Sequence, residues 1–383
     1  MKFIVLAFAL VSLLALQAVA QSPAQLTVTA VNKLKAARQG ETIELAAKDL
    51  AALGEKDLMK LHVFDTSGKE VLSQSVDTDY DDFHKPDTLI FQADFAANET
   101  KTFTVKAGGK REYKKDEFRA YGRFVRERFD DFAWENDRIA HRTYGKALIT
   151  WKGEPLTSSA IDIWSKRTSK LVINDWYMVD NYHTDTGEGM DAYSAGPTRG
   201  CGGSGVWANN QLFIPTNFVD SRVLTNGPIR VMFELVYEPF DAGGMQVSEV
   251  LRVSLDAGSQ LNHFQTYYRA NGPLAVAVGL KKVKDEVKEF NAERGWLTTW
   301  QAVDKNLGMQ GLAVVVSPGD VDKQAEDARN NLLVMKPRSA FPVSYWAGFA
   351  WDRAGVITSA EAWKNYVDDF SERLRSPIQV AVR

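Results

Sequence analysis

Hydrophobic and polar residues alternate with a period of two along much of the chain, in short runs separated by turn residues. The first run, LTVTAVN, begins at Leu26, and ETIELA, KLHVFDTSG and KTFTVKAG follow it. Turns are expected at Gly40, Gly68 and Gly108, which stand between these runs. Because period-two alternation is typical of half-buried strands, the pattern predicts a small β-sandwich over residues 22–110.

A charged connector leads into a second and longer series of strand-like runs. These are RVMFELVYEPF, MQVSEVLRVSLDAG, LNHFQTYYRA, LAVAVGLKKV, GWLTTWQAV and GLAVVVSPG. Strands that follow one another without intervening helices predict antiparallel sheets. We therefore expect an all-β protein whose second part, residues 111–383, is a large antiparallel two-sheet supersandwich. Helices are expected at residues 325–334 and after Ser359, where apolar residues recur with helical spacing, and KDLAALGEKDL in the first part could form one short helix or a loop.

The chain begins with MKFIVLAFALVSLLALQAVAQS, in which one lysine precedes an apolar run that ends in small residues. Ala18 and Ala20 form an A-x-A-like cleavage signal before Gln21. The run is short for a membrane span, and polar sequence follows it at once. The pattern predicts a signal peptide over residues 1–20 and an exported protein, periplasmic or extracellular, without stable membrane insertion.

Composition narrows the range of functions. Cys201 is the single cysteine, so an intrachain disulfide and a multi-cysteine zinc site are excluded, and a buried thiol is expected. The net charge of -3 without a basic stripe argues against a nucleic-acid partner. The ten tryptophans favour a carbohydrate ligand, because indole rings stack on sugar faces. Several stand in glycine- or charge-rich contexts: Trp134, Trp207, Trp296, Trp300 and Trp351. The sequence leaves the oligomeric state open.

The segment from Trp176 to Trp207 carries the strongest chemical signal. It combines many glycines with His183, Glu188 and Asp191, and it has few apolar residues. Such a segment is suited to close contact between backbone and ligand. His183 could serve as a general acid or base if Asp185 or Asp191 positions it. A Ca²⁺ ion held by the carboxylates is possible, although no recognised spacing matches.

A second cluster lies in DFAWENDRIAHRTYGKAL. In strand geometry Arg138, Arg142 and Tyr144 share one face, and two arginines beside a tyrosine suit a carboxylate ligand. Trp134 and Glu135 precede them and are expected to bind substrate as well. The alternative is an arginine–carboxylate network that joins the two domains.

A third set lies on the predicted strand LNHFQTYYR, where His263, Gln265, Tyr267 and Arg269 share one face. This polar face is suited to a concave sugar-binding sheet, and Lys281 adds charge on the next strand. The alternative is a sheet that simply faces solvent.

Several of these motifs together resemble a known family. WENDRIAHRTYG, YHTDTGEGMDAYSAGPTRGCGG, LDAGSQLNHF and AVAVGLKK resemble an uncharacterised family of exported proteins encoded beside pectin- and uronate-degrading genes. The strand order is also similar to the galactose-mutarotase-like supersandwich, which sugar mutarotases share with domains of several polysaccharide lyases. The resemblance implies a uronate-type sugar ligand, but a fold does not fix a mechanism.

The function we predict is that of an exported carbohydrate-active enzyme that acts on an acidic, pectin-like oligosaccharide by β-elimination. Proton abstraction beside a carboxylate needs a cation, a base and an acid. We assign the cation to Arg138 and Arg142, the base to His183 or His263, and the acid to Tyr193 or Tyr267.

Three alternatives stay open at this point. The first is hydrolysis by paired carboxylates, with Glu188 opposite Asp191 or Glu249. The second is mutarotation or isomerisation of a free sugar, with His263 and either Glu234 or Glu249. The third is a glycan-binding protein without catalysis, which would use a tryptophan-rich groove.

Overall fold

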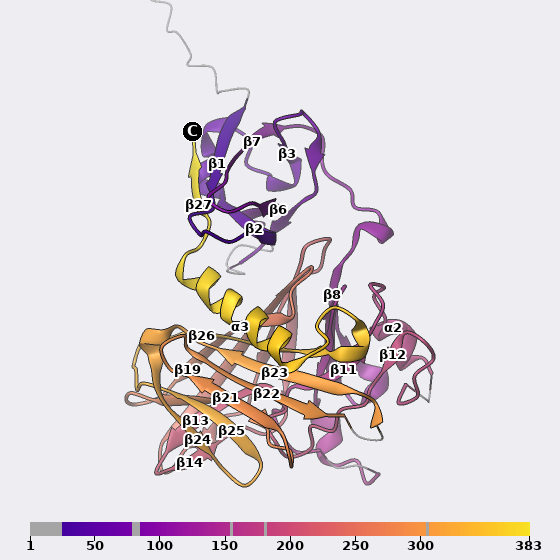
Figure 1. Ribbon diagram of the computed structural model, residues 1–383, viewed down its shortest axis with the longest axis vertical. Helices are drawn as coiled ribbons and strands as arrows, with labels where there is room; N and C mark the ends of the chain where they lie inside the picture. The colour runs from indigo at the N-terminus through magenta and orange to yellow at the C-terminus, as the bar shows by residue number, and fades with distance from the viewer. Residues whose placement is uncertain (1–24, 79–84, 154–155, 180–181, 304–305) are drawn as a thin grey trace, which may run out of the picture.

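The computed structural model describes residues 25–78, 85–153, 156–179, 182–303 and 306–383, so the predicted signal peptide lies outside the described residues. A small β-sandwich stands above a larger body of β-sheets, and a helix runs between them (Figure 1). All sheet pairings among the described strands are antiparallel, apart from two isolated bridges. The prediction of an all-β, sandwich-like protein is confirmed.

The small sandwich is formed by the N-terminal strands together with the C-terminal strand. One sheet has the order β27-β1-β7-β3-β4 and the other β2-β6-β5. Val28, Phe91 and Val105 are buried between them. The elements are β1 (Leu26–Val31), β2 (Arg38–Ala46), α1 (Ala47–Leu50), β3 (Leu61–Phe64), β4 (Glu70–Val71), β5 (Ser73–Val76), β6 (Thr88–Phe95), β7 (Thr100–Ala107) and β27 (Gln379–Val382).

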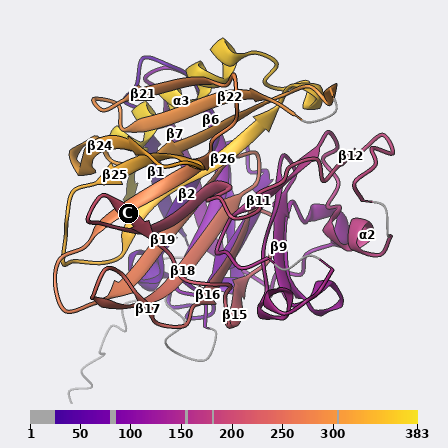
Figure 2. The ribbon, with the colours of Figure 1, turned by 90° about the horizontal axis from the view of Figure 1, so that it is seen from below.

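A third sheet, with the order β12-β11-β10-β9-β8, flanks the larger body and carries the short helix α2 on its outer side (Figure 2). Phe132, Trp134 and Ile163 point from this sheet into the main core, whereas Ala133, Trp164 and their alternating neighbours face α2. The elements are β8 (Ala120–Val125), β9 (Asp131–Asn136), β10 (Ala140–Thr143), β11 (Asp162–Lys166), α2 (Ile173–Tyr177) and β12 (Gly189–Met190).

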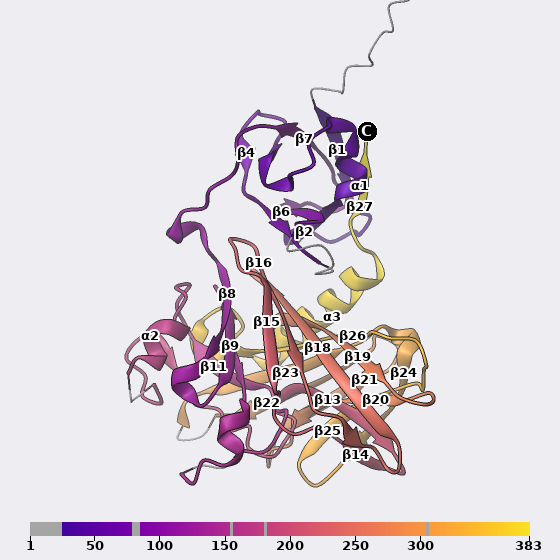
Figure 3. The ribbon, with the colours of Figure 1, turned by 180° about the vertical axis from the view of Figure 1, so that it is seen from behind.

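The main core lies between two further sheets, whose long strands are seen best from behind (Figure 3). The order of one sheet is β14-β13-β20-β25-β24, and its strands are β13 (Cys201–Ala208), β14 (Gln211–Phe213), β20 (Ala275–Lys281), β24 (Val321–Glu326) and β25 (Asn330–Met335). The order of the other is β15-β16-β18-β19-β26-β23-β22-β21, with β17 paired to β18. Its strands are β15 (Asp220–Thr225), β16 (Arg230–Val236), β17 (Phe240–Asp241), β18 (Gln246–Asp256), β19 (Leu261–Arg269), β21 (Val287–Asn291), β22 (Trp296–Ala302), β23 (Met309–Val315) and β26 (Val343–Trp351).

One of the two predicted helices exists and the other does not. Helix α3 (Ala360–Arg375) begins after Ser359, whose hydroxyl accepts a hydrogen bond from the Ala362 amide, and its apolar stripe packs on the outer face of β22 and β23. Residues 325–334, by contrast, lie in the hairpin of β24 and β25, so that prediction was wrong. Asp327 accepts hydrogen bonds from the amides of Arg329 and Asn330 and so fixes a turn, after which a fully buried strand follows.

Candidate active site

Arg142 lies at the centre of a buried group of charged side chains on the outer face of the β8–β12 sheet. On the neighbouring strand Asp162 is its cross-strand partner, and on the other side Asp131 projects from the start of β9. The Arg142 Nε donates to Asp162 Oδ2 at 2.9 Å, and its Nη1 lies 3.8 Å from Asp131 Oδ2. The Tyr144 hydroxyl donates to the same Asp162 oxygen at 3.2 Å.

A third carboxyl group, that of Asp191, reaches Arg142 from the loop after β12. Its Oδ2 lies 3.5 Å from Arg142 Nη2. The strand β12 is held against β11 at Gly189, which has a φ of +119° and whose Cβ, if present, would lie 2.1 Å from the Ser165 carbonyl oxygen. A glycine is therefore required there, and it determines where Asp191 projects two residues later.

The cluster of Asp131, Arg142, Asp162 and Asp191 has more negative than positive groups, and all four are buried. Neither carboxylate oxygen of Asp191, nor Asp131 Oδ2, accepts a hydrogen bond of normal geometry from any described residue. Burial raises the pKa of Asp191 to about 8, with the Asp162 charge adding to the rise and Arg142 opposing it. Burial likewise raises the pKa of Asp131 to about 7, and it raises that of Asp162. Such shifts are found often at sites of proton transfer.

The cluster opens to solvent beside His183, whose side chain is 55% exposed. Its Nδ1 lies 3.1 Å from the Asp191 carbonyl oxygen and 3.7 Å from Asp191 Oδ2. The ring packs on Tyr182 at a centroid distance of 4.4 Å, and the Tyr182 hydroxyl accepts a hydrogen bond from Arg142. Tyr182 therefore connects the exposed histidine with the buried charges.

Arg128 provides a second cation at this opening. Its guanidinium lies 5.7 Å from the ring centroids of Phe129, Trp151 and Tyr182, so aromatic faces surround it. It makes no ion pair with a carboxylate of any described residue, and its buried Nε has no hydrogen-bond partner there. A half-buried, unpaired guanidinium among aromatic rings is suited to binding a carboxylate.

The structure brings four of the predicted site residues together: Arg142, Tyr144, His183 and Asp191. Of the two partners considered for His183, Asp191 is adjacent, whereas Asp185 forms an ion pair with Arg167. The cluster also contains residues that the sequence did not indicate: Arg128, Asp131, Asp162 and Tyr182.

Other predicted residues of the same two motifs lie apart from the cluster. Trp134 is fully buried in the main core, where its indole N–H donates to Asn262. Glu135 is buried in an ion pair with Lys166 at 2.7 Å. Arg138 is in the exposed turn between β9 and β10, so it does not share a face with Arg142. Glu188 pairs with Lys170 at the surface.

The predicted residues on β19 and β20 are also elsewhere. His263 and Tyr267 lie on the half-buried outer face of β19, as the alternation predicted, and Arg269 is exposed at its end. Tyr193 is buried, and the Lys281 ammonium lies 5.2 Å from its ring centroid. None of these side chains contacts the Asp191 carboxyl group through a hydrogen bond or ion pair in the described part of the chain.

The remaining candidates have structural environments. Glu234 is buried between Arg222 and Arg252 on the outer face of the large sheet. Glu249 lies inside the main sandwich near Arg199, and burial raises its pKa to about 8. Cys201 is a buried free thiol, as expected, and burial raises its pKa. Among the described residues no three His, Cys, Asp or Glu side chains converge in the way a metal ion requires, so the geometry gives no support for a Ca²⁺ site.

Comparison with solved structures finds the same kind of all-β fold in other proteins. A glycosyl hydrolase family 38 protein from Enterococcus faecalis superimposes with a TM-score of 0.53 at 12% identity, over 94% of this chain and 47% of that chain. An alpha-mannosidase from Enterococcus faecalis V583 gives a TM-score of 0.46 at 9% identity, over 94% and 46%. The chain thus spans about half the length of these solved proteins, and at such identity the likeness concerns the fold alone.

The chain belongs to the family defined by a domain of unknown function, DUF4861, whose model matches residues 31–380. A relative in Formosa agariphila, described as uncharacterized protein P7, is 33% identical over 375 residues, which is 93% of each chain. The predicted membership of an uncharacterised family is therefore confirmed. None of the helices in the described part of the chain is long and apolar enough to cross a bilayer.

Proposed function

We propose that the protein is a carbohydrate-active enzyme that acts on an acidic sugar by β-elimination, with His183 as the base. The observation that carries the proposal is the placement of His183, which is exposed next to a buried acidic group with raised pKa values. The sandwich fold shared with a glycosyl hydrolase supports the carbohydrate class only. Export to the periplasm or the medium stays a prediction from the N-terminal sequence.

The hydrogen bond of His183 determines which ring nitrogen is basic. Its Nδ1 lies 3.1 Å from the Asp191 carbonyl oxygen, and a carbonyl oxygen can only accept. Nδ1 therefore carries the proton in the neutral ring, which leaves Nε2 as the acceptor. The Asp191 carboxyl group lies 3.7 Å from Nδ1, beyond hydrogen-bond distance, so it is the backbone carbonyl of Asp191 that orients the ring. The arrangement matches a general base oriented by a second residue.

Charge at the opening favours an acidic substrate. Because the pKa of Asp191 is about 8 and that of Asp131 about 7, the buried cluster carries less negative charge at neutral pH than its three carboxyl groups imply. Arg128 then remains as a cation without an ion pair to the described residues, and it lies against Tyr182, the ring on which His183 also packs. We assign the substrate carboxylate to Arg128 in place of Arg138 and Arg142, since Arg138 lies in a separate turn and Arg142 is held by Asp162.

The reaction needs two proton movements. His183 Nε2 removes the proton from the carbon next to the substrate carboxyl group, and Arg128 stabilises the negative charge that develops on that group. The electron pair forms a carbon–carbon double bond as the bond to the β-oxygen breaks. Protonated His183 then returns the proton to the leaving oxygen, so no oxidant or metal is consumed.

The test is turnover of uronate oligosaccharides by the wild-type protein and by His183→Ala, followed by ultraviolet absorbance and product mass. We expect absorbance to rise without a gain of water, and the variant to lose about 10²–10⁴-fold in rate, the usual contribution of general acid–base catalysis. Lys170→Ala, which removes an exposed charge from the same region, is the matched control. A product that gains the mass of water without a rise in ultraviolet absorbance would contradict β-elimination. Full activity of His183→Ala would contradict the assignment of His183 as the base.

A further inference from the structure

A large cleft separates the N-terminal sandwich from the body of the molecule. Its walls are β2 of the small sandwich, helix α3, and the outer face of the large sheet at β16, β18, β19 and β26 (Figures 1 and 3). Its volume is about 2030 Å³. Pockets for single small molecules are usually about 300–1,000 Å³, so this cleft is suited to a longer ligand.

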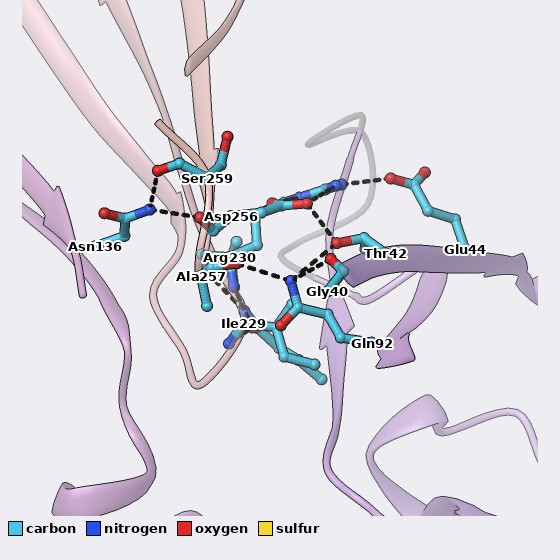
Figure 4. Close-up of polar contacts among 12 residues, drawn as sticks. Gly40, Thr42, Glu44, Gln92, Asn136, Ile229, Arg230, Asp256, Ala257 and Ser259 are labelled. Atoms are coloured by element: carbon cyan, nitrogen blue, oxygen red, sulfur yellow. Dashed lines mark hydrogen bonds and ion pairs between the residues drawn. The ribbon is translucent and has the colours of Figure 1, made fainter. Parts of the chain in front are cut away.

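Direct contacts between the two parts fix the shape of this cleft. Thr42 donates to Asp256 at 2.8 Å, and the Gln92 amide donates to the Ala257 carbonyl at 2.9 Å (Figure 4). Arg230 forms an ion pair with Glu44 at 2.7 Å. On the opposite side of the small sandwich, β27 pairs with β1 and ties the end of α3 to it. The small sandwich is therefore held against the body through the large sheet as well as through α3 and β27.

Aromatic rings form part of the cleft surface. Trp346 is half-buried, with His263 stacked on it at a centroid distance of 4.6 Å and an interplanar angle of 10°. Phe370 of α3 meets Trp346 edge-on at 6.2 Å, and Tyr366 stacks on Phe370. The His263 Nε2 is buried without a hydrogen-bond partner among the described residues. Flat rings beside unsatisfied polar atoms are typical of surfaces that bind sugars, which have apolar faces and polar edges.

Charged groups surround these rings, and most of them are paired. Arg373 binds Glu41 at 3.1 Å, and Arg230 binds Asp256 through two hydrogen bonds. Arg138 is different, because it is exposed at the cleft and makes no ion pair with a carboxylate of the described residues. Two carboxylates of α3 that also line the cleft, Asp369 and Glu372, make no ion pair within the described residues either, so the lining offers charges of both signs. Arg138 is the place in it that is suited to a carboxylate of a largely polar ligand.

We infer that this cleft is a second carbohydrate site, which binds several consecutive units of an acidic oligosaccharide through Trp346 and Arg138. The inference rests on the proposed function for the class of ligand. The cleft and the candidate active site are neighbours, because Arg138 and Arg142 are four residues apart and their Cα atoms can be separated by at most about 14 Å. The cleft thus selects longer chains, and the chemistry takes place at His183.

The test compares binding of a galacturonate disaccharide and hexasaccharide to the full chain, measured by calorimetry, with turnover measured separately. We expect the hexasaccharide to bind at least about tenfold more tightly than the disaccharide. Trp346→Ala should remove that tenfold advantage, because the ring on which the sugar face stacks is lost. Trp346→Phe should retain most of it. Phe124→Ala, which removes an exposed ring outside the cleft, is the matched control and should bind normally.

A further variant distinguishes a loss of binding from a loss of folding. Arg138→Glu changes an exposed turn residue, and it should weaken the hexasaccharide while leaving the disaccharide unchanged. Binding without turnover in the wild-type protein would refute the proposed function and leave the cleft site standing. Equal affinity for both lengths, equal affinity of wild type and Trp346→Ala, or no binding of either sugar would overturn the cleft site.

Discussion

Two buried charged groups lie on the same sheet, and they differ in how completely their polar atoms are paired. Lys166 Nζ donates to Glu135 Oε2 at 2.7 Å, to the Asn136 carbonyl at 2.9 Å and to the Lys170 carbonyl at 2.5 Å. The other Glu135 oxygen accepts from the Ile173 amide at 2.8 Å. This pair is neutral, and all its side-chain polar atoms have partners.

The cluster around Arg142 is neither neutral nor fully paired. Three carboxyl groups share one guanidinium, and both oxygens of Asp191 lack a hydrogen bond of normal geometry from the described residues. Unpaired buried groups are costly, so a fold keeps them where they serve a purpose other than stability. The comparison therefore assigns a structural role to Glu135 and Lys166 and a chemical role to the cluster around Arg142.

The largest expected effect is on stability, at the paired site. Lys166→Met should lower the free energy of unfolding by about 3–5 kcal/mol, because it leaves the Glu135 charge buried without its partner. Chemical denaturation measures this. Lys170→Met, at a side chain that is 72% exposed, is the matched control and should cost less than about 1 kcal/mol. Recovery of stability in the double variant Lys166→Met/Glu135→Leu would support the argument, whereas a small effect of Lys166→Met would contradict it.

The second largest effect concerns the cluster around Arg142, where the free energy of unfolding should depend on pH. The pKa of Asp191 is about 8 in the folded protein and 3.8 without the fold, so the folded state binds the extra proton and stability falls as pH rises. Between about pH 6 and about pH 9 this one group should remove about 2–3 kcal/mol. Asp191→Asn should abolish that part of the fall, as urea denaturation at several pH values would show.

The control for this experiment is Asp175→Asn, an exposed change on α2 close to the same site. It should follow the wild-type curve. Parallel curves for the wild type and Asp191→Asn would mean that Asp191 is ionised in the folded protein, and the contrast between the two charged groups would then be lost.

Much of the fold could be predicted because alternation is a local signal. The outer face of β19 and the cap of α3 at Ser359 both appear in the sequence as short patterns. The hairpin of β24 and β25 was mistaken for a helix, since a short apolar run after polar residues fits either structure. Its strand form is determined by pairing with β20, which the sequence does not display.

Only part of the site could be predicted, because its residues are brought together by the pairing of β10 with β9 and β11. Asp162 is a single acidic residue in an apolar stretch, whereas Asp131 follows Asp130 in a charged segment. Nothing in the sequence shows that Asp162 stands opposite Arg142. Trp134 was wrongly predicted to bind substrate. The alternation along β9 places its side chain on the face that packs in the main core. Arg138 was grouped with Arg142 because the strand was taken to extend through a turn.

The smallest expected effect concerns Arg128, which separates binding of the substrate carboxylate from folding. Arg128→Ala should lower kcat/KM for an acidic sugar by about 10- to 100-fold, the loss of one charge-assisted pair, and should change activity on the methyl ester much less. Stability should fall by only about 0.5–2 kcal/mol, because the guanidinium makes no ion pair with the described residues but does lie over three aromatic rings. Arg126→Ala, an exposed arginine two residues away, serves as the control. An equal loss on acid and ester would show that Arg128 supports the aromatic rings around it and does not bind the carboxylate, and the cation of the site would then have to be Arg142.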